Sequence, residues 1–204
     1  MQHLFGKSVH TAFVVPNLEQ AMQRMFESGF GPAFLLRQLA ITGRFRGHRH
    51  DMVMDVAFFA VGGTHYEFIQ QIDESASAYQ EFLTLNPQGG MHHIAYYSED
   101  FASDIARAKQ AGVVLEVVEE LLSPDDNIFE LYLQPAGSRD AILTQFMFPG
   151  PNETVFAKME EIAAGWDGKE AECSLYELMP AEITLTVASG SARNLLGGHG
   201  RVVN

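Results

Sequence analysis

Cysteine is nearly absent from this chain, since Cys173 is the single copy among 204 residues. One thiol cannot form a disulfide within the chain, and it cannot build a cysteine-rich structural zinc site. Long apolar runs are missing too, because no stretch approaches the roughly 20 residues that a membrane-spanning helix needs. The first residues lack the apolar core of a signal peptide. These absences predict a soluble, cytoplasmic protein without a membrane partner.

Basic residues are also scarce, with 13 Lys and Arg against 26 Asp and Glu, which gives a formal net charge of −13. Nucleic acids and anionic membranes bind basic surfaces, so neither is expected as a partner. No glycine-rich phosphate loop, nucleophile elbow or dinucleotide fingerprint occurs. What the chain does contain is 47% hydrophobic residues, including 15 Phe, a composition typical of a globular protein with a well-filled core.

The chain repeats itself at a fixed distance of 83 residues, without a gap between the two copies. Each copy begins with a histidine in a β-favouring run, continues through a helix N-cap and ends in a glycine. Apolar residues between the cap and the glycine recur at helical spacing. The paired positions are His10 and His93, Asn17 and Asp100, and Gly29 and Gly112. Shared features in register indicate an internal duplication.

Three further strands follow the helix in each copy, so each half is predicted to be a βαβββ module. The expected strands are residues 9–15, 33–38, 52–61 and 64–71 in the first half, and 93–97, 113–119, 127–134 and 141–148 in the second. Two curved sheets of this kind side by side would form an open β-barrel around a shared cleft, where small-molecule sites commonly occur. The predicted fold class is therefore α+β.

The duplication divides the chain into four parts. The first module covers residues 1–72, a linker with a helix at 78–83 covers 73–90, and the second module covers 91–149. A C-terminal helical and extended extension covers 150–204, with an amphipathic helix at 152–164 and extended segments at 174–179 and 182–187. The extension could close the cleft, wrap a second subunit or only cover the core.

Paired βαβββ modules that each open with a histidine resemble the vicinal oxygen chelate superfamily, over roughly residues 7–149. The phrases that resemble its glyoxalase-like, methylmalonyl-CoA epimerase-like branch are HTAFVVPNL at 10–18, GFGP at 29–32, YEFIQQ at 66–71, SAY at 77–79 and GMHHIAY at 90–96. In this family, metal ligands come from the first and last strands of each half. The resemblance therefore implies a small-molecule enzyme with one divalent metal ion per chain.

Four side chains match the ligand positions of the family. They are His10 and His93 on the first strands, and Glu67 and Gln145 near the ends of the last strands. Relatives usually carry glutamate at the position of Gln145, so this residue departs from the common pattern. Two imidazoles with oxygen donors suit Zn, Mn, Co, Ni or Fe. Each residue alone has a plainer interpretation, as a core histidine or as a polar side chain on a half-exposed strand.

Proton transfer would need an acid or a base near such a metal. Strand alternation places His65 on the face of Glu67 and Tyr97 on the face of His93. Glu130 lies in the middle of a strand of the second half, and Glu67 itself could leave the metal and act as the base. The plainer alternative is that Glu130 faces solvent and Tyr97 only packs.

Residues 44–50 form the only dense basic run, between the second and third strands. We expect a loop here in which Arg44, Arg46, His48 and Arg49 bind an anionic group of the substrate. A solvated hairpin tip that balances nearby acids is the alternative.

The resemblance implies an isomerase, epimerase or lyase that acts on a small vicinal-oxygen or thioester substrate through a metal-stabilised, enolate-like intermediate. An extradiol-type ring-cleaving dioxygenase of the same fold is the first alternative. A protein that sequesters a metabolite or drug is the second alternative. Family habit also predicts a homodimer.

Overall fold

The computed structural model describes residues 4–179, and its elements follow the predicted βαβββ order twice. The first half contains β1 (Ser8–Val14), α1 (Leu18–Glu27), β2 (Ala33–Phe45), β3 (His48–Val61) and β4 (Thr64–Gln71). The second half contains β5 (Gly90–Tyr97), α3 (Phe101–Gln110), β6 (Leu115–Leu122), β7 (Ile128–Pro135) and β8 (Leu143–Met147), and α2 (Ala78–Leu85) lies between the halves. The chain continues into α4 (Pro151–Ala164), β9 (Glu172–Ser174) and a short 3-10 turn at Leu175–Glu177.

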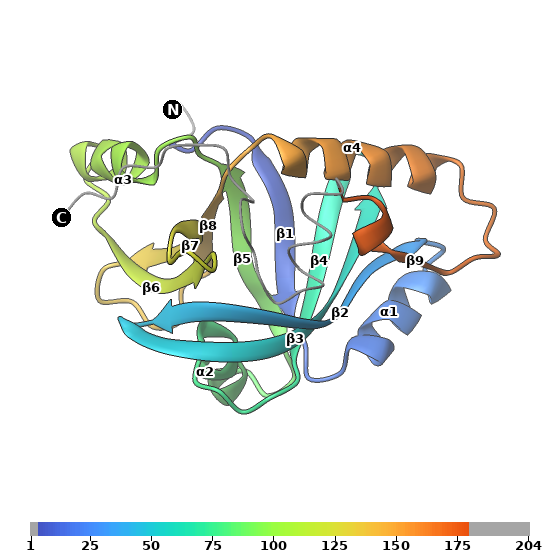
Figure 1. Ribbon diagram of the computed structural model, residues 1–204, viewed down its shortest axis with the longest axis horizontal. Coiled ribbons are helices and arrows are strands. Elements are labelled where there is room, and N and C mark those ends of the chain that lie inside the picture. Colours follow the sequence, from blue (N-terminus) through green and yellow to red (C-terminus); the bar gives the residue numbers. More distant parts are fainter. Residues whose placement is uncertain (1–3, 180–204) are drawn as a thin grey trace.

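The strands form one sheet that curls back on itself, in the order β3-β4-β1-β5-β8-β7-β6-β2-β9. Because β2, the eighth strand of this order, also pairs with β3, the first eight strands close into a ring, and β9 lies beside it (Figure 1). Within each half the first and last strands pair in parallel, and β1 and β5 join the halves as an antiparallel pair. The predicted α+β fold with a ring-like cleft is confirmed, whereas the module boundaries at residues 72 and 91 stay a prediction.

The termini of α1 and α3 confirm the N-cap and glycine signals of the repeat. The side chains of Asn17 and Asp100 each accept a hydrogen bond from a backbone N–H in the first turn of their helix. The glycines just after the helices, Gly29 and Gly112, have φ angles of 80° and 84°. Side chains with a Cβ rarely adopt this conformation, which is why glycine ends both helices.

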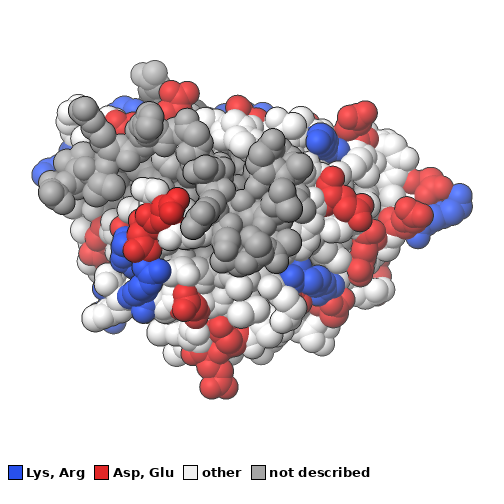
Figure 2. All heavy atoms as spheres, viewed as in Figure 1, with Lys and Arg blue, Asp and Glu red and all other residues white. Residues whose placement is uncertain are grey.

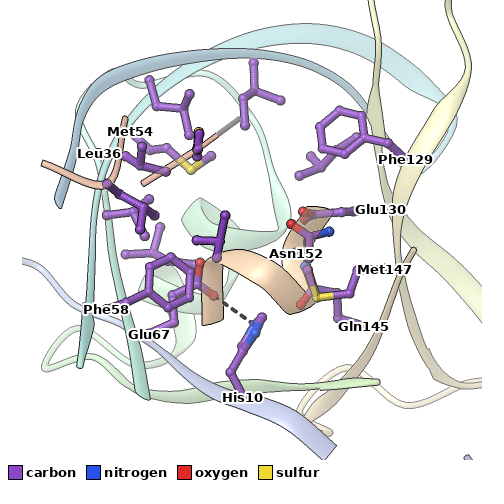
Figure 3. Close-up of a pocket in the computed structure, with 18 of the residues that line it drawn as sticks. His10, Leu36, Met54, Phe58, Glu67, Phe129, Glu130, Gln145, Met147 and Asn152 are labelled. Carbon is purple, nitrogen blue, oxygen red and sulfur yellow. Dashed lines mark hydrogen bonds and ion pairs between the residues drawn. The ribbon is translucent and has the colours of Figure 1, made fainter. Parts of the chain in front are cut away.

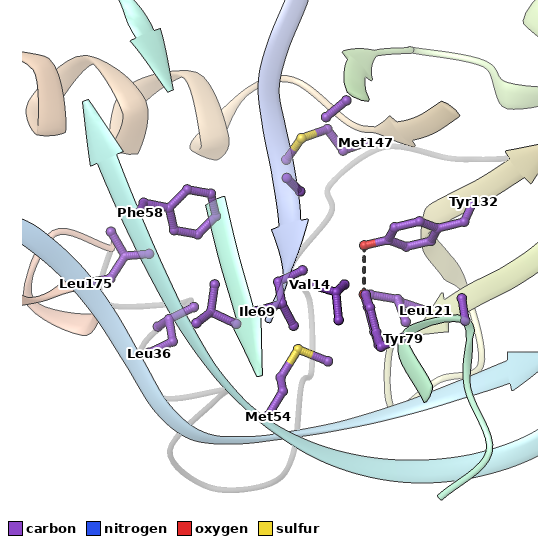
Figure 4. Close-up of a cluster of buried hydrophobic side chains, with 14 of the residues drawn as sticks. Val14, Leu36, Met54, Phe58, Ile69, Tyr79, Leu121, Tyr132, Met147 and Leu175 are labelled. Carbon is purple, nitrogen blue, oxygen red and sulfur yellow. Dashed lines mark hydrogen bonds between the residues drawn. The ribbon is translucent and has the colours of Figure 1, made fainter. Parts of the chain in front are cut away.

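Helices α1 and α3 occupy equivalent places on the outside of the ring. Leu18 and Met22 of α1 are fully buried against β2 and β3, and each such side chain contributes about 1.5–3 kcal/mol relative to full exposure. Phe101 and Ile105 of α3 pack in the same way against β7 and β8. The interior of the ring holds a separate, larger cluster (Figure 4). The sheet is therefore covered outside and filled inside.

The β2–β3 hairpin corrects the predicted loop. The sequence predicts strands that end at residue 38 and restart at 52, but the structure carries both strands through residues 44–50, with a turn only at Arg46 and Gly47. These two residues have φ angles of 48° and 82°, the left-handed values that a two-residue hairpin turn requires. The expected basic loop is therefore wrong, because most of that segment is paired strand.

A β-bulge explains why the sequence pattern predicts a β2 strand that is too short. The pairing of β2 with β3 shifts between Leu36 and Leu39, and Gln38 has a φ of 53°. The side chain of Asp55 accepts a hydrogen bond of 2.7 Å from the Gln38 backbone N–H. The bulge shifts the alternation of apolar residues, so the periodic pattern ends there although the strand continues.

The far end of the hairpin reaches the second half and closes the ring there. Glu119 of β6 is fully buried, and its carboxylate lies 2.6 Å from His50 Nε2 and accepts a 2.9 Å hydrogen bond from the Ala78 N–H of α2. A Cβ on Gly43 would lie 2.8 Å from Glu119 Oε1, so only glycine permits this approach. One carboxylate thus links β3, β6 and α2.

The C-terminal extension begins as predicted, with α4 along one end of the ring (Figure 1). Val155, Phe156 and Met159 of α4 join the interior cluster. The extended segment expected at 174–179 is instead the end of β9 followed by a 3-10 turn, whereas the segment at 182–187 and the glycine-rich tail lie outside the described residues. Within residues 4–179, no helix has the length and apolar character needed to cross a membrane.

Replacing Glu119 by alanine should destabilise the protein by about 2–4 kcal/mol, because the half-buried His50 ring and the Ala78 N–H lose their partner. The free energy of unfolding in urea measures this. Glu120→Ala is the matched control, since its 3.4 Å pair with Arg44 is partly exposed and should contribute less than about 1 kcal/mol. Equal effects of the two substitutions would show that Glu119 does not hold the ring closed.

Candidate metal centre

Strand alternation turns the predicted ligands toward the interior of the ring. On β1 the inward residues include His10, and on β4 they include Glu67. The strand register makes Glu67 and Gln145 equivalent, because Glu67 lies opposite Ala12 on β1 and Gln145 lies opposite Ala95 on β5. Ala12 and Ala95 are themselves 83 residues apart, the distance of the repeat.

Three donor atoms form a nearly equilateral triangle across the β1–β5 junction. The Oε2 atom of Glu67 lies 3.2 Å from His10 Nε2 and 3.3 Å from His93 Nε2, and the two Nε2 atoms are 3.3 Å apart. All three residues are buried, with 9% exposure for Glu67, 3% for His10 and none for His93. No N–H of the described residues is aligned for a hydrogen bond to Glu67 Oε2. Two imidazole nitrogens and one carboxylate oxygen therefore converge on one small space.

The charges of this triangle are strongly coupled. Burial raises the pKa of Glu67, but His10 and then His93 outweigh burial and bring the pKa down to about 2. Burial lowers the pKa of His93 despite the opposing effect of Glu67. The Glu67 carboxyl is thus readily ionised and the His93 imidazole binds a proton poorly, which is the protonation state that metal ligands require.

Gln145 is held in a network that fixes the orientation of its amide. Its Nε2 atom donates to Glu130 Oε2 at 2.7 Å and to the Tyr132 hydroxyl at 2.9 Å. The Tyr79 hydroxyl, from α2, in turn donates to the Tyr132 hydroxyl at 3.0 Å (Figure 4). The Oε1 atom of Gln145 is buried and has no hydrogen-bond partner among residues 4–179. An amide oxygen in this position is available as a further metal ligand.

These residues fit a divalent metal ion. Ligand atoms about 2.0–2.1 Å from a common ion lie about 2.9–3.4 Å from each other at coordination angles of 90–110°. The three measured distances fall within that range. Two imidazoles with a carboxylate and an amide oxygen suit the borderline ions of the first transition series and zinc. That Gln145 completes the set stays a prediction.

The triangle opens into a cavity of about 390 Å³ inside the ring (Figure 3). His10, Glu67 and Gln145 lie on one side of it, and Glu130 lies beside Gln145. The other walls are mostly apolar, and α4 contributes to them. A volume of this size lies within the roughly 300–1,000 Å³ of small-molecule sites. The donor triangle is therefore accessible from a space that could hold a ligand.

The structure brings together some of the predicted acid–base residues and not others. Glu130 lines the cavity, and burial, followed by the charge of Glu67, raises its pKa to about 7. His65 faces inward as predicted, but it lies against the ring of Phe156 and 3.4 Å from Glu160 of α4 and does not line the cavity. Tyr97 does not line it either; burial and then Glu153 raise its pKa.

The predicted anion-binding residues do not line the cavity. Arg44, Arg46 and Arg49 instead form ion pairs with Glu120, Glu81 and Asp126, respectively. His48 is exposed at the hairpin turn. Figure 2 shows the same mixing, since basic side chains on this face adjoin acidic ones. A role for the four residues in substrate binding stays a prediction, without support from their position.

Comparison with known proteins agrees with this geometry. The sequence profile of the Glyoxalase/Bleomycin resistance protein/Dioxygenase superfamily matches residues 9–125. The chain belongs to this superfamily. An ethylmalonyl-CoA/methylmalonyl-CoA epimerase from Cereibacter sphaeroides is 30% identical over 109 residues, which are 53% of this chain and 73% of the relative.

The fold of this superfamily member is also found in a solved structure. The methylmalonyl-CoA epimerase of Mycobacterium tuberculosis superimposes with a TM-score of 0.50 over 75% of this chain and 94% of its own. Sequence identity is 16%, so this likeness concerns the fold alone. The family and the fold predicted from the sequence are both confirmed.

Two features of this superfamily member were missed in the sequence. Tyr79 and Tyr132 lie 53 residues apart in the chain, and no local pattern indicates that their hydroxyls meet. His92 points away from the cavity toward α2, as alternation predicts, yet its Nδ1 lies 2.9 Å from Nδ1 of the candidate ligand His93. If His93 binds a metal through Nε2, its Nδ1 carries the proton and donates it to His92, which fixes the tautomer of the ligand.

Replacing His92 by phenylalanine should weaken binding of Zn²⁺ about 10-fold or more, because His93 loses the acceptor that orients its ring. Competition with a chromophoric chelator measures the affinity. His92→Gln retains a polar partner and should recover part of the loss, while His48→Phe at the exposed turn should change nothing. Unchanged affinity in His92→Phe would contradict this positioning role.

Proposed function

We propose that the protein is a divalent-metal-dependent isomerase or epimerase that moves a proton on the carbon next to a carbonyl group. The observation that carries the proposal is the His10–Glu67–His93 triangle, which opens into a mostly apolar cavity. Similarity to an epimerase of coenzyme A thioesters supports the reaction type and suggests a thioester as substrate. The predicted homodimer and cytoplasmic location remain part of the proposal.

His10, Glu67, His93 and the amide oxygen of Gln145 would hold the ion. When bound, a divalent ion supplies a Lewis acid that polarises a carbonyl oxygen and so acidifies the neighbouring C–H. One carboxylate among the ligands leaves the centre with a net positive charge. The chain itself supplies the orientation of these ligands, through His92 on one side and the Tyr79–Tyr132–Gln145 network on the other.

Glu130 is the residue placed to carry the proton. It lines the cavity next to Gln145, and the amide of Gln145 and the hydroxyl of Tyr132 both donate to its Oε2 atom, at 2.7 and 3.3 Å. These bonds hold one oxygen in place and leave the other to approach a substrate. The mostly apolar walls limit side reactions of a reactive intermediate with water. A proton held on the Glu130 carboxyl can still exchange with solvent before a proton returns to the substrate carbon. Glu67, tied to two histidines, is less free for this role.

Protein purified with Zn²⁺ or Mn²⁺ should contain about one ion per chain, and His10→Ala or Glu67→Ala should reduce this strongly, because each removes one of a few donors. Elemental analysis after gel filtration measures the content. His48→Ala, a histidine at the exposed hairpin turn, is the matched control and should keep full occupancy. Full occupancy in both cavity variants would place the ion elsewhere, and no ion in the unaltered protein would favour a metabolite-sequestering role.

Metal-loaded protein should exchange solvent deuterium into the carbon next to the carbonyl of a thioester, tested with 2-methyloctanoyl-CoA and methylmalonyl-CoA by mass spectrometry. Glu130→Gln should slow exchange by about 10²–10⁴-fold, the usual contribution of a positioned acid or base, while metal content stays unchanged. Asp126→Asn, an exposed carboxylate outside the cavity, should exchange normally. If protein with bound metal exchanges deuterium into neither thioester, the proposal is contradicted.

A ring-cleaving dioxygenase is the second candidate, because two histidines and one carboxylate are also the ligand set of non-haem iron oxygenases. Oxygen uptake by the Fe²⁺-loaded protein with catechols distinguishes the two. Uptake without deuterium exchange would favour the dioxygenase, and exchange without uptake favours the isomerase.

A further inference from the structure

The interior cavity has a charge pattern that narrows the substrate class. Within residues 4–179, no lysine or arginine lines it. Its ionisable lining side chains among these residues are His10, the carboxylic acids Asp51, Glu67 and Glu130, and the phenols Tyr79 and Tyr132. An anionic group placed here, away from a bound metal ion, would meet other carboxylates and find no cationic side chain of residues 4–179. The lining therefore disfavours a substrate that carries a carboxylate away from the metal.

Apolar groups form the wall opposite the donor triangle. Leu36, Met54 and Phe129 lie on the far side of the cavity from His10 and Glu67 (Figure 3). Further apolar residues that line the cavity include Leu39, Ile41, Val56, Leu122 and Met147. Burying a carboxylate against such a wall without a partner costs several kcal/mol, whereas burying a hydrocarbon there is favourable.

Methionines around the cavity allow apolar groups of different shapes to fit. Met54, Met147, Met159 and Met179 all line the cavity. Methionine side chains are unbranched and polarisable, so they adapt to apolar groups of differing outline. The cavity is thus polar at the donor triangle and pliable and apolar beyond it.

We infer that the part of the natural substrate enclosed in this cavity is a metal-chelating oxygen group attached to an uncharged, apolar body, so that no carboxylate lies beyond the chelating group. This inference rests on the proposed function, because it assumes that the donor triangle binds the oxygen end of the substrate. In the malonyl groups named for the relative, the carboxylate and the thioester carbonyl flank one carbon, so both could belong to the chelating end and the inference concerns the apolar group beyond them. A branched or aromatic acyl group fits the pattern.

Two hydroxamates of equal length test the inference in the full-length, Co²⁺-loaded protein. Octanohydroxamate has a metal-chelating head and an apolar tail, and suberic acid monohydroxamate differs by a carboxylate at the end of the tail. Isothermal titration calorimetry should give a dissociation constant for octanohydroxamate at least about 10-fold lower, because only the other ligand must bury a charge. Equal or tighter binding of the carboxylated ligand would overturn the inference.

A wall variant gives a second, independent reading. Ile41 is half-buried on the lining, and Ile41→Arg should reduce the preference for octanohydroxamate about 10-fold by offering the carboxylate a partner. Val114→Arg adds the same charge at a residue that is 56% exposed and outside the cavity, and it should leave the preference unchanged. A preference that persists in Ile41→Arg would contradict binding of the tail at this wall.

The outcomes separate this inference from the proposed function. Metal-loaded protein that binds neither hydroxamate would contradict both, since the donor triangle would then not accept a chelating ligand. Deuterium exchange together with preference for the carboxylated hydroxamate would leave the proposed function standing and remove the inference about the substrate.

Discussion

The Glu67 carboxylate has lost nearly all contact with water, and a charge in that position needs a partner of opposite sign. Two imidazoles approach it, and burial lowers the pKa of one of them, His93, so a protonated His93 is not the natural partner. A divalent cation between the three donor atoms resolves this conflict, because it satisfies the carboxylate and uses the histidines in their neutral form. Much of the surrounding structure serves to hold these atoms together.

The ring and the duplication supply that support. Parallel pairing of the first and last strands places one ligand position from each on neighbouring strands, and the antiparallel pair β1–β5 brings the two copies face to face. The linker helix α2 contacts both sides of the centre: Tyr79 joins the network of Gln145, and Phe82 packs against His92. The linker helix therefore takes part in orienting the ligands, besides connecting the halves.

Sequence reasoning predicted the fold and the inward position of the four donor residues, because the 83-residue repeat places matching residues at equivalent positions on equivalent strands. It failed where structure depends on contacts between distant segments. Strands β2 and β3 continue to a turn at Arg46 and Gly47, but the bulge at Gln38 interrupts the alternating pattern, so the sequence predicts shorter strands. His65 was assigned to the cleft by alternation, yet Phe156, from an extension without a counterpart in the repeat, covers it. The hydrogen bond between the hydroxyls of Tyr132 and Tyr79 could not be predicted, because no local sequence pattern relates the two residues.

Anomalous diffraction at the absorption edge of the bound metal, from crystals of the full chain, decides whether the donor triangle is a metal site. The account predicts one strong peak about 2.0–2.3 Å from His10 Nε2, Glu67 Oε2 and His93 Nε2, with the amide oxygen of Gln145 turned toward it. A peak beside His48 and His50 with none inside the ring would contradict it, as would an ordered cavity whose three donors are joined only by hydrogen bonds.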